Sequence, residues 1–158
     1  KTLSYIDIGQ SEGAELVTGG KRIDAKGFEE GYFVEPTVFA NVNNQMRIAR
    51  EEIFGPVASI IPFDTEEEAI AIANDTTYGL TAGLWTQNNA RAHRVSQQIE
   101  AGMVWVNTYR WIRWSTPYGG FKMSGWGREN GVDALAPYLE TRTTVMGLTG
   151  QFPNPYAS

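Results

Sequence analysis

Strand-like and helix-like segments alternate along the chain, and this alternation is the feature that most restricts its fold. Continuous apolar runs at residues 57–61 and 103–106 are typical of buried strands, and shorter strand-like stretches lie at 15–18 and 82–85. Helical patterns occupy residues 1–14 and the intervals between the later strands. Such alternation predicts an α/β fold in which helices cover a sheet.

Two of the expected helices carry start signals. Thr65 followed by Glu68 forms a capping box, in which the hydroxyl accepts a free amide of the first turn and the carboxylate reaches back. Asn88 or Asn89 can cap a second helix that runs to Ala101. These signals predict helices over residues 65–74 and 88–101.

The last part of the chain reads less regularly. A helical face follows Gly131, and Pro137 should kink or end that helix. The β-branched run 141–146 predicts one more strand, and the proline-containing tail 151–158 is expected to be irregular.

Composition excludes several classes of function. Thirteen Lys and Arg residues against eighteen Asp and Glu give a formal net charge of −5, which argues against a nucleic-acid partner. No apolar run is long enough to span a membrane and no signal segment opens the chain, so we expect no membrane partner and a cytoplasmic location. Cysteine is absent, which removes disulfides and a thiol nucleophile from these 158 residues, and no metal-ligand pattern occurs. Position 1 is Lys, so we expect a fragment or a processed product.

The first stretch that suggests chemistry is EEIFGPV at residues 51–57, directly before a predicted buried strand. A carboxylate there could accept both hydrogen bonds of a ribose diol, and Phe54 could pack against a flat heterocycle. An acidic turn with Phe54 in the core is the simpler alternative, and spacing alone favours it.

The second stretch is residues 108–127, which lie between a predicted strand and a helix and show little periodicity. Loops longer than about 12–15 residues are usually functional or disordered, and this one is rich in aromatic residues and glycine. It suits either the wall of a small-molecule pocket or a self-packed cover of the core. Arg110 and Arg113 could clamp an anionic substrate group or remain solvated.

Together, five motifs in order resemble the NAD(P)-dependent aldehyde dehydrogenase superfamily. The motifs are EEIFGPV at 51–57, NDTTYGL at 74–80, GMVWVN at 102–107, PYGGFK at 117–122 and SGWGRE at 124–129. The resemblance implies the last third of such an enzyme. The cofactor-binding domain, the general-base Glu and the catalytic Cys would then precede position 1.

The resemblance implies an α/β fold that forms part of the family's catalytic domain, an open twisted sheet with flanking helices, over residues 1–140. Residues 141–158 would be an oligomerisation strand and tail, which implies a homo-oligomer. The cofactor would be NAD or NADP, and the small-molecule substrate an aldehyde, weakly an aromatic or carboxylate-bearing one.

Roles carry over by motif. Glu52 would hydrogen-bond the nicotinamide ribose and Phe54 would border the nicotinamide, whereas no catalytic residue is expected in this chain. Three residues, Asn107, Arg128 and Glu129, would support the site. The aldehyde channel would be lined by Tyr109, Trp111, Ile112, Trp114 and Tyr118.

In the family's mechanism a cysteine thiolate attacks the aldehyde, hydride passes to the nicotinamide, and water hydrolyses the resulting thioester. We therefore expect this chain to supply cofactor and channel contacts, with Glu52 and Phe54 facing the aromatic segment across a shared cavity, and to be inactive alone. The alternative is a free-standing, self-associating α/β module with a binding or structural role and no catalysis.

Overall fold

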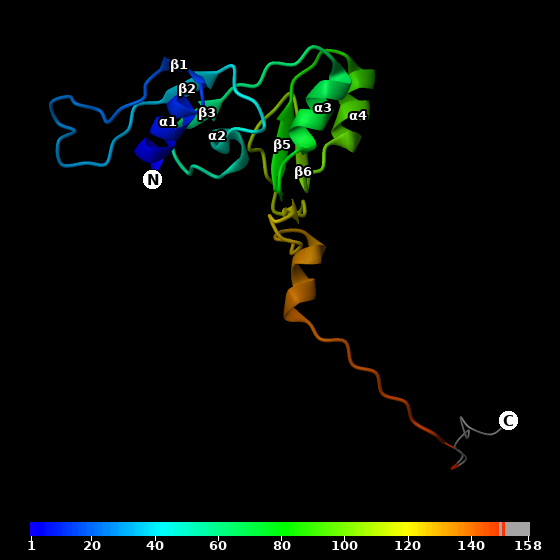
Figure 1. The fold of residues 1–158 in the computed structure, drawn as a ribbon. Coiled ribbons are helices and arrows are strands. Elements are labelled where there is room, and N and C mark those ends of the chain that lie inside the picture. The colour runs from blue at the N-terminus through cyan, green and yellow to red at the C-terminus, as the bar shows by residue number, and fades with distance from the viewer. Residues whose placement is uncertain (149, 151–158) are drawn as a thin grey trace.

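The computed structural model describes residues 1–148 and 150, which form a first lobe, a second lobe and an extended C-terminal segment (Figure 1). The first lobe contains α1 (Thr2–Ser11), β1 (Glu15–Thr18), β2 (Thr37–Ala40), α2 (Arg47–Arg50) and β3 (Val57–Ser59). The second lobe contains α3 (Glu66–Asn74), β4 (Tyr78–Gly79), β5 (Thr81–Leu84), α4 (Asn89–Gln98), β6 (Met103–Val106) and β7 (Phe121–Lys122). A 3-10 helix, η1 (Val132–Tyr138), follows.

The first lobe is built on a three-stranded sheet and holds most of the buried core. In this sheet β2 pairs antiparallel with β1 and parallel with β3. Gly9 lets α1 approach the core closely, because an added Cβ would lie 3.0 Å from Cδ1 of Ile48. The buried cluster consists of Ile6, Ala14, Phe39, Val42, Ile48 and Ile53.

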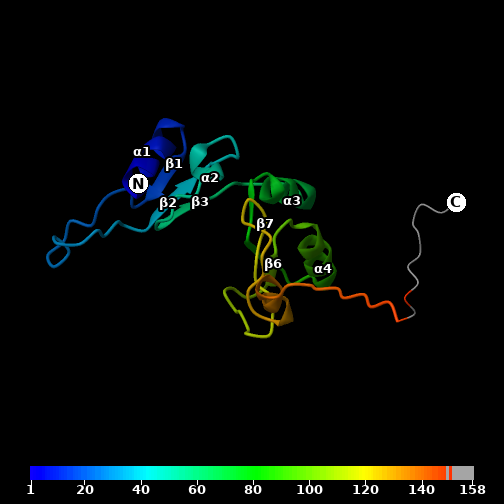
Figure 2. The ribbon, with the colours of Figure 1, turned by 90° about the horizontal axis from the view of Figure 1, so that it is seen from below.

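The second lobe places α3 and α4 beside the parallel pair β5–β6 (Figure 2). Glu66 joins the two helices, since its carboxylate accepts hydrogen bonds from Arg91 Nε at 2.9 Å and from Arg94 Nε at 2.6 Å. A separate antiparallel pair joins β4 to β7, so residues far apart in the sequence meet there. Trp105 is the one large side chain buried in the described part of this lobe.

The predicted helix starts are confirmed. Thr65 Oγ1 accepts a hydrogen bond from the Glu68 amide at 3.1 Å, and Asn88 Oδ1 accepts one from the Arg91 amide at 2.9 Å. The Glu68 carboxylate accepts from the amide of Asp64, one residue before the cap. The second of these helices ends at Gln98, earlier than expected.

The α/β class is confirmed, but the sheet differs in detail from the expected open one. The described residues form three small sheets, β1–β2–β3, β4–β7 and β5–β6, with no ladder between them.

Residues 141–146 do not form a strand in this structure. They leave η1 as an extended, exposed segment, and within the described residues they pair with no other strand (Figure 1). High β propensity favours the extended backbone, but a strand also requires a hydrogen-bonding partner. The predicted assembly through this segment stays a prediction, and the tail 151–158 lies outside the described residues. Pro137 falls inside η1, which is a 3-10 helix and not an α-helix.

Within residues 1–148 and 150, every helix is too short or too polar to cross a bilayer.

Candidate functional site

The turn between α2 and β3 presents Glu52 and Phe54 outward. Ile53 lies between them and is buried in the core of the first lobe, at 8% exposure. Because this anchor points inward, its two neighbours face solvent, and the Phe54 ring is 85% exposed. The alternative in which Phe54 joins the core is therefore wrong.

Phe54 also adopts an unusual backbone conformation, with φ of 57°. A left-handed conformation costs a residue with a Cβ roughly 1–2 kcal/mol, and such residues are concentrated at functional sites. The residue just before it, Ile53, is buried in the core of the first lobe. The turn therefore has a strained residue with an exposed aromatic ring.

Glu52 and Phe54 border one hollow of about 370 Å³ on the surface of the first lobe. Its lining combines apolar side chains from α2 and β3 with the acidic residues Glu51 and Glu52. Its lining residues are Ile48, Ala49, Glu51, Glu52, Ile53, Phe54, Gly55, Val57, Ser59 and Ile61.

A network of charged and polar groups fastens this turn to the first helix. Glu51 accepts a hydrogen bond from the Tyr5 hydroxyl at 2.5 Å and from Arg47 Nε at 2.8 Å. The hydrogen bonds from Arg47 and then from Tyr5 lower the pKa of Glu51 to about 2. The ammonium of Lys1 donates to the backbone carbonyl of Glu52 at 2.6 Å. These contacts hold both ends of the Glu51–Glu52 pair.

The sequence indicated only half of this network. Arg47 and Glu51 are spaced i,i+4, which is a recognisable pairing on a helix. Tyr5 lies 46 residues from Glu51, and nothing local marks their contact.

The aromatic segment begins where β6 ends, and Asn107 fixes that point. Its side-chain carbonyl accepts from the Thr86 amide at 2.8 Å, and its side-chain amide donates to the Thr86 carbonyl at 2.9 Å. Asn107 has φ of 53°, a conformation that Asn tolerates better than most residues. The ends of β5 and β6 are thereby held side by side.

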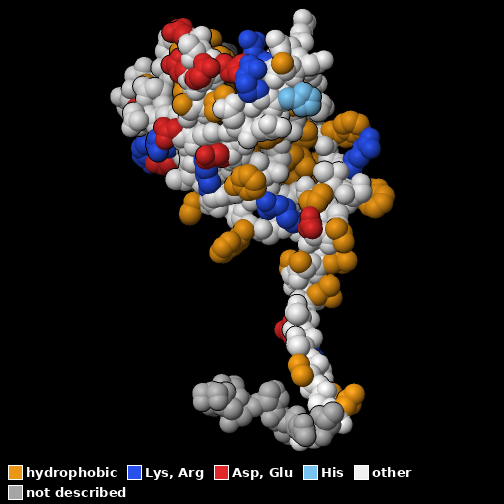
Figure 3. Space-filling view, turned by 90° about the vertical axis from the view of Figure 1, so that its right-hand side faces the viewer, with side chains coloured by type: hydrophobic (Ala, Val, Ile, Leu, Met, Phe, Trp, Pro, Cys, Tyr) orange, Lys and Arg blue, Asp and Glu red, His pale blue; other side chains and the backbone are white. Residues whose placement is uncertain are grey.

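Trp105, a buried residue of β6, contacts the loop that follows the strand. Its indole Nε1 donates to the carbonyl of Trp111 at 3.0 Å, and its ring meets Tyr109 edge-on with centroids 5.4 Å apart. Most aromatic side chains of the segment beyond this anchor are exposed, Trp114 at 86% and Trp126 at 95%. Hydrophobic side chains gather where the chain leaves the body (Figure 3). The exposed, predicted channel residues are Tyr109, Trp111, Ile112 and Trp114.

Arg128 and Glu129 close the far end of the segment. Arg128 Nη1 donates to the carbonyls of Gly120 at 3.0 Å and Gly127 at 2.8 Å, so it holds the glycine-rich turn together. Glu129 exchanges two backbone hydrogen bonds of 2.7 Å with Tyr118, which is half-buried. Both residues act here through the backbone of the segment.

A hub formed by Asn74 and Lys122 joins two of the motifs, 74–80 and 117–122, and no local pattern in the sequence predicts it. Lys122 Nζ donates to the carbonyl of Asn74 at 2.8 Å and pairs with Glu100 at 2.6 Å. The Asn74 side chain donates to the Gln98 carbonyl at 2.8 Å and accepts from the Glu100 amide at 2.9 Å. Three segments of the second lobe therefore meet at this point: the end of α3, the end of α4 and β7.

The structure does not bring the two predicted halves of the site around one cavity. The described residues that line the hollow at Glu52 and Phe54 include none from 108–127. The two groups belong to different lobes, and within the described residues no ladder joins the β1–β2–β3 sheet to β5–β6. The turn at residues 51–55 and the aromatic loop are each held by their own hydrogen bonds.

Comparison with known proteins identifies the relatives of this chain. The model of the aldehyde dehydrogenase family matches residues 1–144. The chain is 51% identical over 156 residues to a betaine aldehyde dehydrogenase of Brucella anthropi, covering 99% of this chain and 32% of that protein. The chain thus spans about a third of the length of the curated relatives it matches.

Solved structures agree. An indole-3-acetaldehyde dehydrogenase complexed with NAD+ superposes with a TM-score of 0.85 at 52% identity, covering 90% of this chain and 28% of that one. A betaine aldehyde dehydrogenase of Staphylococcus aureus superposes with a TM-score of 0.93 at 39% identity, covering 99% of this chain and 31% of that one.

Proposed function

Since the chain belongs to the aldehyde dehydrogenase family, we propose that it forms the nicotinamide-contacting and substrate-channel part of an NAD(P)-dependent enzyme that oxidises an aldehyde to a carboxylic acid. Within this proposal, residues 1–140 belong to the catalytic domain. The observation that carries it is the outward presentation of Glu52 and Phe54 on one fastened turn, at the edge of a hollow of about 370 Å³.

The residues present fit a nicotinamide nucleoside. An ionised Glu52 carries two acceptor oxygens and no donor, which matches the paired hydroxyl donors of a ribose diol. The exposed Phe54 ring offers a flat apolar face to a flat heterocycle. When bound, the nicotinamide supplies the hydride acceptor. Glu52 would hold the ribose, and Phe54 the nicotinamide ring, in a fixed position relative to the protein.

The remaining predicted residues serve the aldehyde. Tyr109, Trp111, Ile112 and Trp114 present exposed apolar surface beyond the carboxyl ends of β5 and β6, where α/β proteins commonly bind ligands. Tyr118 joins them through its backbone pairing with Glu129. Asn107, Arg128 and Glu129 position this surface.

The nucleophile must come from elsewhere, because these 158 residues contain no cysteine. We therefore expect no NAD(P)-linked aldehyde oxidation by this chain alone, measured as the absorbance of the reduced nicotinamide. Turnover without a partner polypeptide would contradict this expectation. The proposed location of the enzyme is the cytoplasm.

The test of the nicotinamide site uses reduced nicotinamide mononucleotide, which carries the proposed contacts without the adenosine half. Titration is followed by the fluorescence of the dihydronicotinamide ring. Glu52→Gln should weaken binding about tenfold or more, because a hydrogen bond to a charged group contributes about 1.5–3 kcal/mol. Phe54→Ala should weaken it about two- to tenfold, because an aromatic contact contributes about 0.5–1.5 kcal/mol.

Two matched controls make this test specific. Glu30→Gln removes another exposed carboxylate, and Tyr32→Ala removes a ring that is 98% exposed. Neither control should change the affinity. Equal weakening by test and control variants, or none by either, would overturn the proposed role of the turn.

A further inference from the structure

The aromatic loop lies in the longest stretch of this acidic protein that lacks carboxylates. Residues 101–128 contain four Lys and Arg side chains and no Asp or Glu. Lys122 is neutralised by Glu100, and Arg128 donates to backbone carbonyls. Within the described residues, Arg110 and Arg113 have neither an acidic partner nor a hydrogen-bond acceptor for their guanidinium groups.

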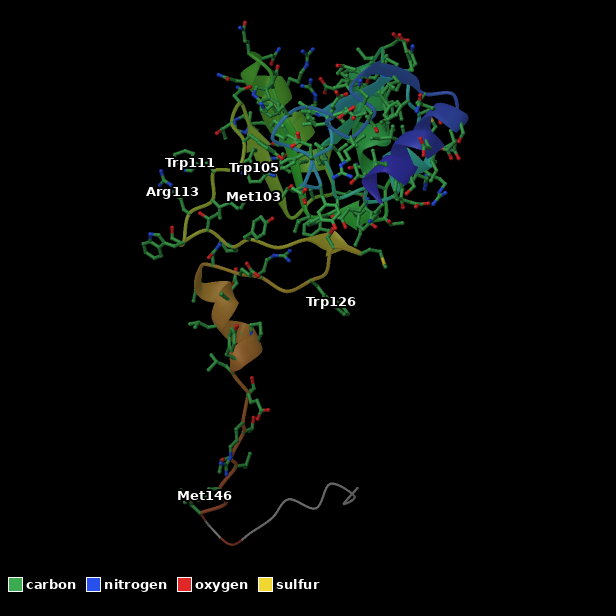
Figure 4. The ribbon with its side chains drawn as sticks, turned by 90° about the vertical axis from the view of Figure 1, so that its left-hand side faces the viewer. Met103, Trp105, Trp111, Arg113, Trp126 and Met146 are labelled. Atoms are coloured by element: carbon green, nitrogen blue, oxygen red, sulfur yellow. The ribbon has the colours of Figure 1, made fainter. Side chains whose placement is uncertain are left out.

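Both guanidinium groups lie over aromatic rings. Arg113 Cζ is 4.5 Å from the centroid of Trp111, and Arg110 Cζ is 5.4 Å from that of Tyr109. Figure 4 shows Trp111 and Arg113 together at one side of the loop. Neither guanidinium donates a hydrogen bond within the described residues, so its N–H groups are available to bind a carboxylate with two parallel hydrogen bonds.

The loop holds these pairs in place. Arg110 has φ of 58°, a left-handed conformation that a residue with a Cβ adopts only under constraint. The hydrogen bond from the Trp105 indole to the Trp111 carbonyl ties the loop to a buried side chain. The Arg–aromatic pairs are therefore presented on an anchored backbone.

We propose that Arg110 and Arg113 recognise a carboxylate of the substrate, so that the enzyme takes aldehydes that also bear a carboxylate and a flat apolar body. The apolar body packs on Trp111 and Trp114, and the carboxylate meets the guanidinium edges. Two unneutralised cations also repel a cationic aldehyde and attract an anionic one. This inference rests on the proposed function, because it names the substrate class of the same channel.

The test compares phenylacetate with phenylacetamide, which have nearly the same shape and differ in charge. Each is titrated into the 158-residue chain, and the indole N–H signals of its five tryptophans are followed by NMR. Phenylacetate should shift the Trp111 and Trp114 signals saturably, with about tenfold or greater preference over phenylacetamide, as expected for charge-assisted hydrogen bonds. The Trp85 signal should not respond.

Three single variants test whether the two arginines cause the preference for phenylacetate. Arg113→Gln and Arg110→Gln should each remove most of the preference for phenylacetate, whereas Lys26→Gln, which removes one exposed cation elsewhere, should keep it. Equal shifts by both probes, no shift by either, or equal loss in Lys26→Gln would overturn the inference. Reduced nicotinamide mononucleotide separates the two proposals. If reduced nicotinamide mononucleotide binds through Glu52 but the chain shows no preference for phenylacetate, only this inference fails. If phenylacetate is preferred but the mononucleotide does not bind through Glu52, only the proposed nicotinamide site fails.

Discussion

Asn107 and Thr86 bind each other through two opposed hydrogen bonds. The Thr86 amide donates to Asn107 Oδ1 at 2.8 Å, and Asn107 Nδ2 donates to the Thr86 carbonyl at 2.9 Å. A side-chain amide thus replaces a backbone peptide and continues the pairing of β5 and β6 beyond their ends. The aromatic loop starts from this fixed point.

We expect Asn107→Ala to lower the free energy of unfolding by about 1 kcal/mol, because it removes both hydrogen bonds to Thr86 at an exposed position. Asn107→Gly should cost less, since Gly tolerates the φ of 53°. Urea unfolding followed by tryptophan fluorescence measures both. Equal stability of wild type and Asn107→Ala would show that the bridge contributes nothing.

Gly102 is predicted to be intolerant of any side chain. A Cβ there would overlap the carbonyl oxygen of Gly119, and its own amide donates to the Gly79 carbonyl at 3.0 Å. Gly102→Ala should therefore lower the unfolding free energy by about 1–3 kcal/mol through overpacking. Gly127→Ala is the matched control, because no atom lies within 4 Å of its added Cβ. Thermal unfolding compares the two variants, and similar midpoints would contradict the predicted overlap.

The Glu51 network predicts a specific acid sensitivity. The pKa of Glu51 is about 2 in the folded chain, against an ordinary value of 4.5, because Arg47 and Tyr5 hydrogen-bond its ionised form. A lowered folded-state pKa gives stability that is present above pH 4.5 and is lost as the pH falls toward 2. Between these limits, the unfolding free energy of wild type should fall more steeply than that of Glu51→Gln.

Urea unfolding at a series of acidic pH values measures this difference in slope. Glu30→Gln serves as the control, since Glu30 accepts no hydrogen bond in the described residues, and it should keep the wild-type slope. If the unfolding free energies of wild type and Glu51→Gln fall in parallel as the pH is lowered, the Glu51 network does not cause the acid sensitivity.

Self-association through residues 141–146 is the fourth prediction. Val145 and Met146 are exposed, and the backbone of this segment pairs with no strand in the described residues. An unpaired, β-branched segment is suited to edge-to-edge pairing with a second copy. Light scattering should show an oligomer for wild type and a smaller species for Thr143→Pro, which removes a backbone donor. Thr143→Ala keeps that donor and should stay associated, and a well-folded wild-type monomer would contradict the prediction.

The local pattern of residues was sufficient for much of the framework. β1 has the predicted bounds Glu15–Thr18, and α3 ends at Asn74 as expected. The Thr65 and Asn88 caps form as predicted. Each of these features depends on groups a few residues apart, so the information lies within one stretch of sequence.

Features that join distant residues could not be predicted in this way. The β4–β7 pair joins Tyr78 to Lys122, and Tyr5 reaches Glu51, without any local pattern that marks either contact. The strand predicted at 141–146 illustrates the same point, because propensity without a partner leaves only an extended segment.

The sequence by itself determined the α/β class, the main helices and strands, and the family motifs that direct attention to Glu52 and Phe54. Only the tertiary structure decided that Phe54 faces solvent, because that depends on Ile53 entering a core built from α1, β2 and α2. It also decided that the aromatic loop does not share the hollow beside Glu52 within the described residues. Local hydrogen bonds are encoded by neighbouring residues, whereas burial and cavities depend on which distant segments pack together.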